Sequence, residues 1–528
     1  MVVFSNSMSH RQKNMNIPAI TKKHLLFALV LLLAFVVRAL LIIYAQTNGG
    51  DWLTYERFAD NILHGNGFSL SDPASSVIVP SSGGYYPGFP AFIALVWLLF
   101  GKSVMAVLWA QLVLYILALY WLLTSLLKLT NNIHLVTGAG LLLALSPLTA
   151  GWSRFPLTES LAITASMWFL AEIINSLAVK KLRVLPLAAA LAASIYIRPD
   201  TVLMAIAVFP VSTYLYERKR DVFKQIVIFI LLTSVPVTAW MVRDVLIGRA
   251  PISMHEGEGR FLRQGYFAWV NTWAVNEYER ADALFYDPEH TQFHPSKFRT
   301  EAESKTAYEL LAQLSSDESK IMSEPVDNRF QELANEKSAK TGVLTKAELF
   351  IKKSYNLLLN PFSSWGLPLE VGYDFDRSAA LKAIKSADFA HLSALVATNK
   401  SVVIGKLLLF LYRLILFPSF FMLFFSVVRK TLINKVFTPC IFDLNILVSA
   451  SFMVMFSRLF FFVFLGGLES RYIVEVIPWV ECLLFWFSVN WRIQMFELVY
   501  KHGGIHHAQA TEKLPGSGQS IHSQKAPC

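Results

Sequence analysis

Long apolar runs recur along this 528-residue chain, and no other feature constrains its fold as strongly. Each run is long enough, as a helix, to cross about 30 Å of hydrocarbon. With 54% hydrophobic and 16% charged residues, the composition is far from that of soluble proteins. Inside a bilayer only helices or a closed barrel satisfy the backbone, and the sequence lacks the short alternating strands of a barrel. We therefore predict an all-α polytopic membrane protein.

Ten of these runs are candidates for membrane spans: 25–45, 103–127, 133–150, 157–178, 183–198, 201–216, 223–247, 402–427, 438–465 and 471–491. An eleventh run, 86–100, has only 15 residues and contains two prolines. If it does not cross, the basic N-terminus and later basic clusters such as 218–220 share one side, as the positive-inside rule requires. If it crosses, those clusters lie opposite the N-terminus. We therefore expect about 10 transmembrane helices, cytoplasmic termini, and outer juxtamembrane helices at 53–64 and 87–100.

The expected organisation has five parts in chain order: a cytoplasmic N-terminus (1–24), a transmembrane module (25–247) with a first outer loop (46–102), an extracytoplasmic segment (248–400), C-terminal transmembrane helices (401–492) and a disordered cytoplasmic tail (493–528). No small-residue cleavage site follows the first apolar run. We therefore interpret that run as an uncleaved anchor.

The extracytoplasmic segment contains helical patterns. They cover 301–322, 326–340 and 345–359. The last opens with Thr345-Lys-Ala-Glu348, a capping-box pattern that predicts the start of a helix. Its apolar positions indicate a face laid on the bilayer or against the spans; they are Leu349, Phe350, Tyr355, Leu357 and Leu358.

The net charge of +10 is distributed unevenly. Segment 248–400 holds 18 Lys/Arg and 21 Asp/Glu, a balance of −3, so the rest of the chain carries +13, mostly beside the apolar runs. This distribution indicates membrane topology and argues against a nucleic-acid partner. The three cysteines, Cys440, Cys482 and Cys528, are too scattered for a disulfide framework.

Ionisable side chains gather where this threading brings the outer loops together. The acids are Asp51 and Glu159, and the arginines are Arg154, Arg198, Arg243 and Arg471. Ionisable residues at the margin of a span cost free energy and are default candidates for function. Carboxylates suit a general base or a ligand for a hard cation, and a guanidinium can bind two phosphate oxygens at once. The set fits a lipid-phosphate leaving group and an acceptor hydroxyl that must lose its proton.

Each of these residues also has a structural explanation. Arg154, Arg198 and Arg471 could end helices by snorkelling. Asp51 could be an ordinary N-cap, and Glu159 could stabilise the first turn of its helix. Three more arginines lie deeper in apolar runs and are expected to pair with neighbours or snorkel; they are Arg38, Arg413 and Arg458.

Several short motifs follow one another in a specific order. The first outer loop carries Gly50-Asp51, Tyr55, Ala59, Leu63, Gly65 to Ser69, and Tyr86-Pro87-Gly88-Phe89-Pro90. Later motifs are Leu145-Ser146-Pro147, Ser153-Arg154, Leu157-Thr158-Glu159, Ile197-Arg198-Pro199-Asp200, Pro236 with Trp240 and Arg243, and Glu469 to Tyr472 with Pro478. In these motifs the chain resembles the GT-C class of integral-membrane glycosyltransferases, especially bacterial relatives of the family 39 protein O-mannosyltransferases and the aminoarabinose transferase of lipid A. The resemblance covers about 45–250 and 466–480.

The resemblance implies a GT-C-like bundle and a polyprenyl-phosphate monosaccharide as donor. It implies that Asp51 is the catalytic base and that Glu159 has a supporting or metal-linked role, the two acids being the ligands of any divalent cation. Binding of the donor phosphate is assigned to the matching arginines, which are Arg154, Arg243, Arg471 and Arg198. The substrate pocket is assigned to Tyr55, Tyr86, Pro87 and Tyr472. The mannosyltransferases carry adjacent Asp-Glu in the first loop, whereas here Asp51 is followed by Trp52.

The expected function is therefore transfer of a hexosyl or pentosyl group from a polyprenyl-phosphate donor to an envelope acceptor: protein, lipid or glycan. The expected location is the bacterial cytoplasmic (inner) membrane, with the active site on the periplasmic face among membrane lipids. A transporter or flippase for lipid-linked sugars is the alternative, because it would also need outer arginines and a lipid path. A non-enzymatic scaffold would leave the acids and arginines unexplained.

Overall fold

The computed structural model describes residues 19–47, 51–80, 86–247, 264–284, 292–315, 323–361, 363, 365–367, 386, 388–433, 439–465 and 468–484. Over these residues the chain is helical, and its strand-type pairing is limited to one bridge between Ser69 and Pro80. The prediction of an all-helical membrane protein is confirmed. The predicted tail 493–528 and most of the N-terminus lie outside the described residues.

Within the described residues, six helices are long and apolar enough to cross a membrane. They are α1 (Ala19–Ala45), α4 (Val104–Thr130), α7 (Thr158–Ala178), α10 (Lys219–Leu246), α18 (Lys400–Ile433) and α19 (Pro439–Leu465). A bent pair adds a seventh if it is counted as one span: α5 (Ile133–Leu145) and the segment that begins with α6 (Pro147–Ala150), at 41° to it.

The remaining predicted spans are shorter or irregular in the described chain. The run at 183–198 forms α8 (Val184–Ile197), and the next forms a 3-10 helix, η2 (Pro199–Ala207), followed by α9 (Val208–Leu215). Pro199 lacks a backbone N–H and fixes φ, which explains the break after α8. The last predicted span begins as another 3-10 helix, η5 (Ser470–Val476), and its residues after 484 are not described.

The first outer loop contains the two expected juxtamembrane helices, α2 (Trp52–Leu63) and α3 (Gly88–Phe100). At 13 residues, α3 is about 20 Å long and too short to cross the hydrocarbon by itself. Gly88 lets α3 approach the bundle closely, because a Cβ at this position would lie 2.5 Å from the carbonyl oxygen of Tyr196. The first outer loop is thereby fixed against α8.

A large hydrophobic core joins the spans, and α7, which packs on α4 and α8, is buried on nearly every face. A separate small core lies in segment 248–400 around Trp269 and Phe330. It is formed mainly by α11 (Gln264–Asn271), α12 (Glu277–Leu284), α13 (Glu301–Ser315) and α14 (Glu324–Lys340), with a short η3 (Pro295–Lys297). Two further helices, α15 (Val343–Leu359) and α17 (Phe389–Thr398), lie beside the spans.

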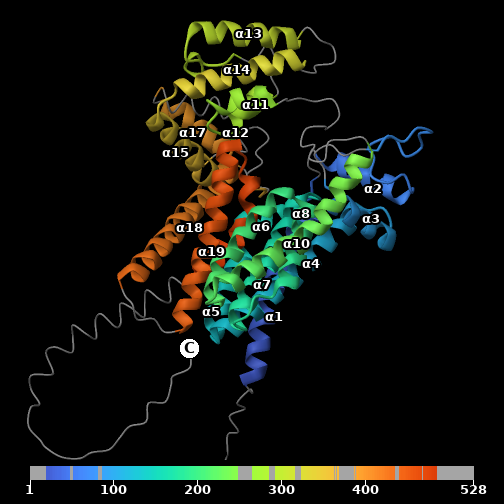
Figure 1. The fold of residues 1–528 in the computed structure, drawn as a ribbon, viewed down its shortest axis with the longest axis vertical. Helices are drawn as coiled ribbons and strands as arrows, with labels where there is room; N and C mark the ends of the chain where they lie inside the picture. Colours follow the sequence, from blue (N-terminus) through green and yellow to red (C-terminus); the bar gives the residue numbers. More distant parts are fainter. Residues whose placement is uncertain are drawn as a thin grey trace, which may run out of the picture.

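All these outer helices lie at one end of the bundle together with α2 and α3, opposite the end where α1 begins (Figure 1). We call this the outer end. One local prediction is wrong: α15 begins at Val343 with Gly342 as its N-cap, so Thr345 and Glu348 lie inside the helix and form no capping box.

Candidate active site

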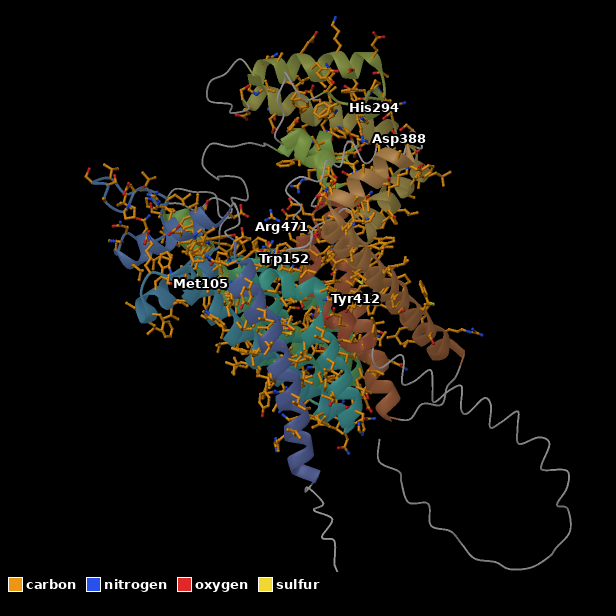
Figure 2. The ribbon with its side chains drawn as sticks, turned by 180° about the vertical axis from the view of Figure 1, so that it is seen from behind. Met105, Trp152, His294, Asp388, Tyr412 and Arg471 are labelled. Carbon is orange, nitrogen blue, oxygen red and sulfur yellow. The ribbon has the colours of Figure 1, made fainter. Side chains whose placement is uncertain are left out.

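An ion-pair network at the outer end joins four of the residues singled out in the sequence. Asp51 lies where α2 begins, Glu159 in the first turn of α7, Arg198 between α8 and η2, and Arg471 in η5. Arg471 Nη1 lies 3.2 Å from Asp51 Oδ2 and 3.9 Å from Glu159 Oε1, while Arg198 Nη1 lies 3.3 Å from the same Glu159 oxygen. Figure 2 labels Arg471 at this end of the bundle.

The network continues inward through two acids and a third arginine. Arg198 Nε lies 3.3 Å from Asp200 Oδ1 and 3.2 Å from Glu475 Oε1. Arg458 Nη2 lies 2.5 Å from Asp200 Oδ2 and 2.8 Å from Glu475 Oε2, and it also donates to the carbonyl oxygen of Tyr472 at 2.6 Å. The expected pairing of Arg458 with its neighbours is confirmed.

Exposure of the side chains separates the network into two parts. Arg458, Glu475, Glu159 and Arg198 are buried, whereas the side chain of Asp51 is 47% exposed and that of Arg471 is 31% exposed. Buried ion pairs with several hydrogen bonds are rigid, and exposed pairs exchange partners at small cost. The Asp51–Arg471 pair is therefore the part of the network that a substrate can reach.

The charge state of the inner part follows from its contacts. Burial alone would raise the pKa of Asp200, but the Arg198 and Arg458 guanidiniums outweigh it and hold that pKa below its ordinary value. Burial lowers the pKa of Arg198, yet Asp200, Glu475 and Glu159 together raise it above the usual value. Arg198 and Asp200 are therefore both charged, and each stabilises the charge of the other.

Asp51 does not act as a helix cap. It occupies the N-cap position of α2, but its backbone is αR and its side chain accepts no capping hydrogen bond. The carboxylate instead receives a hydrogen bond from Arg471. The N-cap explanation of Asp51 is therefore wrong in this structure.

Arg154 and Arg243, which the resemblance assigns to the donor phosphate, have other surroundings. Arg154 lies in η1 (Gly151–Arg154), is buried, and donates to the carbonyl oxygens of Gly366 (2.7 Å) and Ala45 (2.8 Å). Arg243 pairs with Asp244 at 2.8 Å and donates to the carbonyl oxygen of Phe68 at 3.1 Å, so it fastens α10 to the first outer loop. Through these contacts Arg154 holds α1 and residue 366 together, and Arg243 holds the first outer loop against α10.

Of the four predicted pocket residues, Tyr472 lies inside the network and the other three belong to the first outer loop. The Tyr472 ring lies 5.5 Å from the guanidinium carbons of both Arg198 and Arg471, inside the network. Tyr55 packs edge-on against Phe89 at 5.0 Å, between α2 and α3. Tyr86 and Pro87 precede α3, with Pro87 as its N-cap, and burial and then the charge of Asp244 raise the pKa of Tyr86.

Comparison with known proteins adds one likeness. No protein-family model and no curated protein matches the chain. Among solved structures, the chain is similar to ArnT. That structure, the crystal structure of ArnT from Cupriavidus metallidurans bound to undecaprenyl phosphate, matches over 89% of this chain and 78% of its own, with 13% identity and a TM-score of 0.35. The functional proposal therefore rests on the residues of this chain.

Four network residues were not singled out as candidates in the sequence: Asp200, Glu469, Glu475 and Arg280. Glu469 Oε2 lies 2.6 Å from Arg471 Nε, and its other oxygen lies 3.4 Å from Arg280 of α12, which links the outer helices to the network. A usable signal was present for Asp200, inside the Arg-Pro-Asp motif. Glu475 had no usable signal, because it lies in the 3-10 helix η5 and its partners, Arg198 and Arg458, come from other elements.

The arrangement does not suit the divalent cation that the resemblance allows. Asp51 and Glu159 both approach the same nitrogen of Arg471, so a guanidinium already lies where a cation shared by the two acids would bind. Among the described residues, no group of three or more His, Cys, Asp or Glu side chains is arranged to hold a metal.

Proposed function

We propose that the protein transfers a monosaccharide from a polyprenyl-phosphate donor to an acceptor hydroxyl at the outer face of the membrane. One observation carries the proposal: an accessible carboxylate, Asp51, is paired with an accessible guanidinium, Arg471, at the open end of a buried ion-pair network. A glycosyl transfer from a lipid phosphate needs these two groups side by side, one for the acceptor proton and one for the phosphate.

In the proposed reaction, Asp51 accepts the proton of the acceptor hydroxyl as its oxygen attacks the anomeric carbon. A new C–O glycosidic bond forms, the bond from the anomeric carbon to the phosphate oxygen breaks, and the configuration inverts. Arg471 stabilises the negative charge that develops on the leaving lipid phosphate. The phosphate thereby takes the place of Asp51 on Arg471, which frees the carboxylate to act as base.

The lipid part of the donor would lie beside the first outer loop. Leu95, Leu98, Leu99 and Phe100, near the end of α3, are all exposed large apolar side chains. Exposed apolar side chains on a short helix beside the spans are typical of contact with acyl chains. This surface supports a lipid-borne donor that approaches the network from the bilayer.

The decisive test is Asp51→Asn in the purified full-length protein. The amide keeps the size of the side chain and cannot accept the proton, so release of lipid phosphate from labelled polyprenyl-phosphate sugar should fall by roughly 10²- to 10⁴-fold. Asp60→Asn is the matched control, because Asp60 is an acid of α2 that pairs with Lys102 at 2.6 Å, and its removal should leave turnover nearly unchanged. Near-normal turnover of Asp51→Asn would refute the role of Asp51.

A transporter or flippase of lipid-linked sugars is the second candidate. The observation in its favour is the 41° bend between α5 and α6, because broken helices are common in transporters. Proteoliposomes with labelled donor separate the two functions. Transfer releases lipid phosphate, whereas transport moves intact donor across the bilayer and releases none.

A further inference from the structure

Helix α15 carries an apolar stripe that faces away from the protein. The large side chains Val343, Leu344, Ile351 and Tyr355 are all exposed, with Leu344 at 87% and Ile351 at 65%. Positions 344, 348, 351 and 355 lie on one face, because steps of three, four and seven residues return to the same side of an α-helix. Glu348 on this face pairs with Lys352, and the three apolar side chains around it mark an interaction surface.

Phe350 and the last turn of α15 are fixed to the spans. Leu357 and Leu358 belong to the large core, and Phe350 lies 6.2 Å from Phe460 and 5.9 Å from Phe464 of α19, between ring centroids. The apolar positions predicted in the sequence therefore divide into two sets. Phe350, Leu357 and Leu358 contact the spans, and Tyr355 belongs to the exposed stripe.

The helix that carries the stripe packs against a span that must face lipid. Both α15 and α17 pack against α18, and they lie at its outer end (Figure 1). Phe389 of α17 is 73% exposed. Along α18 itself the exposed large side chains include Ile404, Leu407, Leu408, Leu411 and Ile415. Because α18 is a membrane span, acyl chains cover these residues, and α15 and α17 pack against this same lipid-facing helix.

Basic residues accompany the stripe. Lys346 and Lys352 of α15 and Lys400, the first residue of α18, are exposed. A helix with one apolar face and lysines beside it is typical of the boundary between headgroups and acyl chains. In water the apolar side chains of the stripe would stay hydrated, which is unfavourable. In an outer leaflet, acyl chains would cover the apolar side chains and lipid headgroups would contact the lysines.

We propose that α15 and α17 form an interfacial platform whose apolar stripe lies in the headgroup–acyl boundary of the leaflet at the outer end. The occupant of the stripe is lipid. The platform supports α11–α14, since α15 connects directly to α14 and packs on the spans. This inference concerns the position of the outer helices at the membrane surface and is independent of the reaction assigned to Asp51.

Spin labels on single-cysteine variants of the full chain in phosphatidylcholine–phosphatidylglycerol nanodiscs test the proposal. With Cys440, Cys482 and Cys528 replaced, labels are placed at Leu344→Cys, Ile351→Cys or Tyr355→Cys. Leu407→Cys on α18 is the lipid-facing control, and Glu332→Cys on α14 is the water-facing control. The measurement compares collisions with oxygen, which concentrates in the bilayer, and with a water-soluble nickel chelate.

We expect the oxygen-to-nickel ratio on the stripe to exceed that of the Glu332 label several-fold and to approach that of the Leu407 label. Three results would overturn the proposal. A ratio equal to that of the Glu332 label would mean that the stripe faces water. Protection from both reagents would mean that protein covers it. Spin–spin broadening between singly labelled chains would mean that a second copy covers it. Labels at three positions guard against a single variant that fails to fold.

Discussion

Asp51–Arg471 and Glu475–Arg458 are both carboxylate–guanidinium pairs, but their surroundings give them different roles. An exposed pair contributes about 1 kcal/mol or less to stability. Removal of one partner from a buried pair costs about 3–5 kcal/mol, because the other charge remains buried without compensation. The outer pair can therefore change partners during a reaction, and the inner pair maintains the structure.

This difference predicts opposite effects of two arginine substitutions. Arg458→Met should lower the free energy of unfolding by about 3–5 kcal/mol, because the carboxylates of Asp200 and Glu475 lose one of their two arginine partners and only Arg198 remains to balance both charges. Arg471→Gln should lower it less, because its partners Asp51 and Glu469 are partly exposed to water and Glu159 keeps Arg198, but it should strongly reduce release of lipid phosphate. Thermal unfolding in detergent and donor turnover are measured on both variants. Equal destabilisation by the two substitutions would contradict the division of the network.

Sequence alone could identify the outer pair but not its partners. Ionisable groups at the margin of a span cost free energy and are therefore candidates for function. This rule identified Asp51, Glu159, Arg198 and Arg471. Which acid meets which arginine depends on spans far apart in the chain. Arg154 has the same residue type and position as the network arginines, yet it binds main-chain carbonyl oxygens. A difference of that kind is set by tertiary packing.

At the scale of elements, the contact between α3 and α8 positions the first outer loop. The two helices approach so closely that Gly88 has no room for a side chain beside the carbonyl of Tyr196. The helix bounds of α2 and α3 were predictable from apolar pattern and length. The break after α8 was predicted by the separate runs 183–198 and 201–216, but the 3-10 conformation of η2 was not, because apolar pattern does not distinguish a 3-10 helix from the start of an α-helix.

Gly88→Val should therefore separate α3 from α8 and destabilise the protein by about 1–3 kcal/mol, the usual cost of overpacking. Gly342→Ala is the control, because a Cβ there would meet nothing within 4 Å and the backbone φ is −65°. Thermal unfolding of the two variants gives the comparison. Equal midpoints would show that α3 does not depend on this close approach.

At the scale of the whole molecule, α15 joins two hydrophobic cores. Its Leu357 and Leu358 belong to the core of the spans, and its buried Lys353 donates from Nζ to the carbonyl oxygen of Asn271 in α11 at 2.6 Å. Burial lowers the pKa of Lys353 to about 8, from an ordinary value of 10.5. The link between the cores is therefore sensitive to pH.

The sign of this dependence follows from proton linkage. Between pH 8 and 10.5 the unfolded chain keeps a proton on Lys353 that the folded chain has released, so folded stability should rise with pH in this window, by about 3 kcal/mol at most. Lys353→Met should remove this rise, and Lys352→Met, at an exposed neighbour, should keep it. Unfolding midpoints from pH 7 to 10.5 are compared, and an identical rise in both variants would exclude Lys353 as the source.

The network at the outer end also has a consequence for how the protein is made. Arg471 follows Asp51 by 420 residues, and Arg458 and Glu475 come from the same late part of the chain. Synthesis proceeds from the N-terminus, so Asp51, Glu159 and Arg198 emerge long before the groups that hold them in place. A ribosome that stops early leaves a chain with the acid but without its arginine. The order of synthesis therefore determines when the site can form. It is complete only after Arg458, Arg471 and Glu475 have been synthesised.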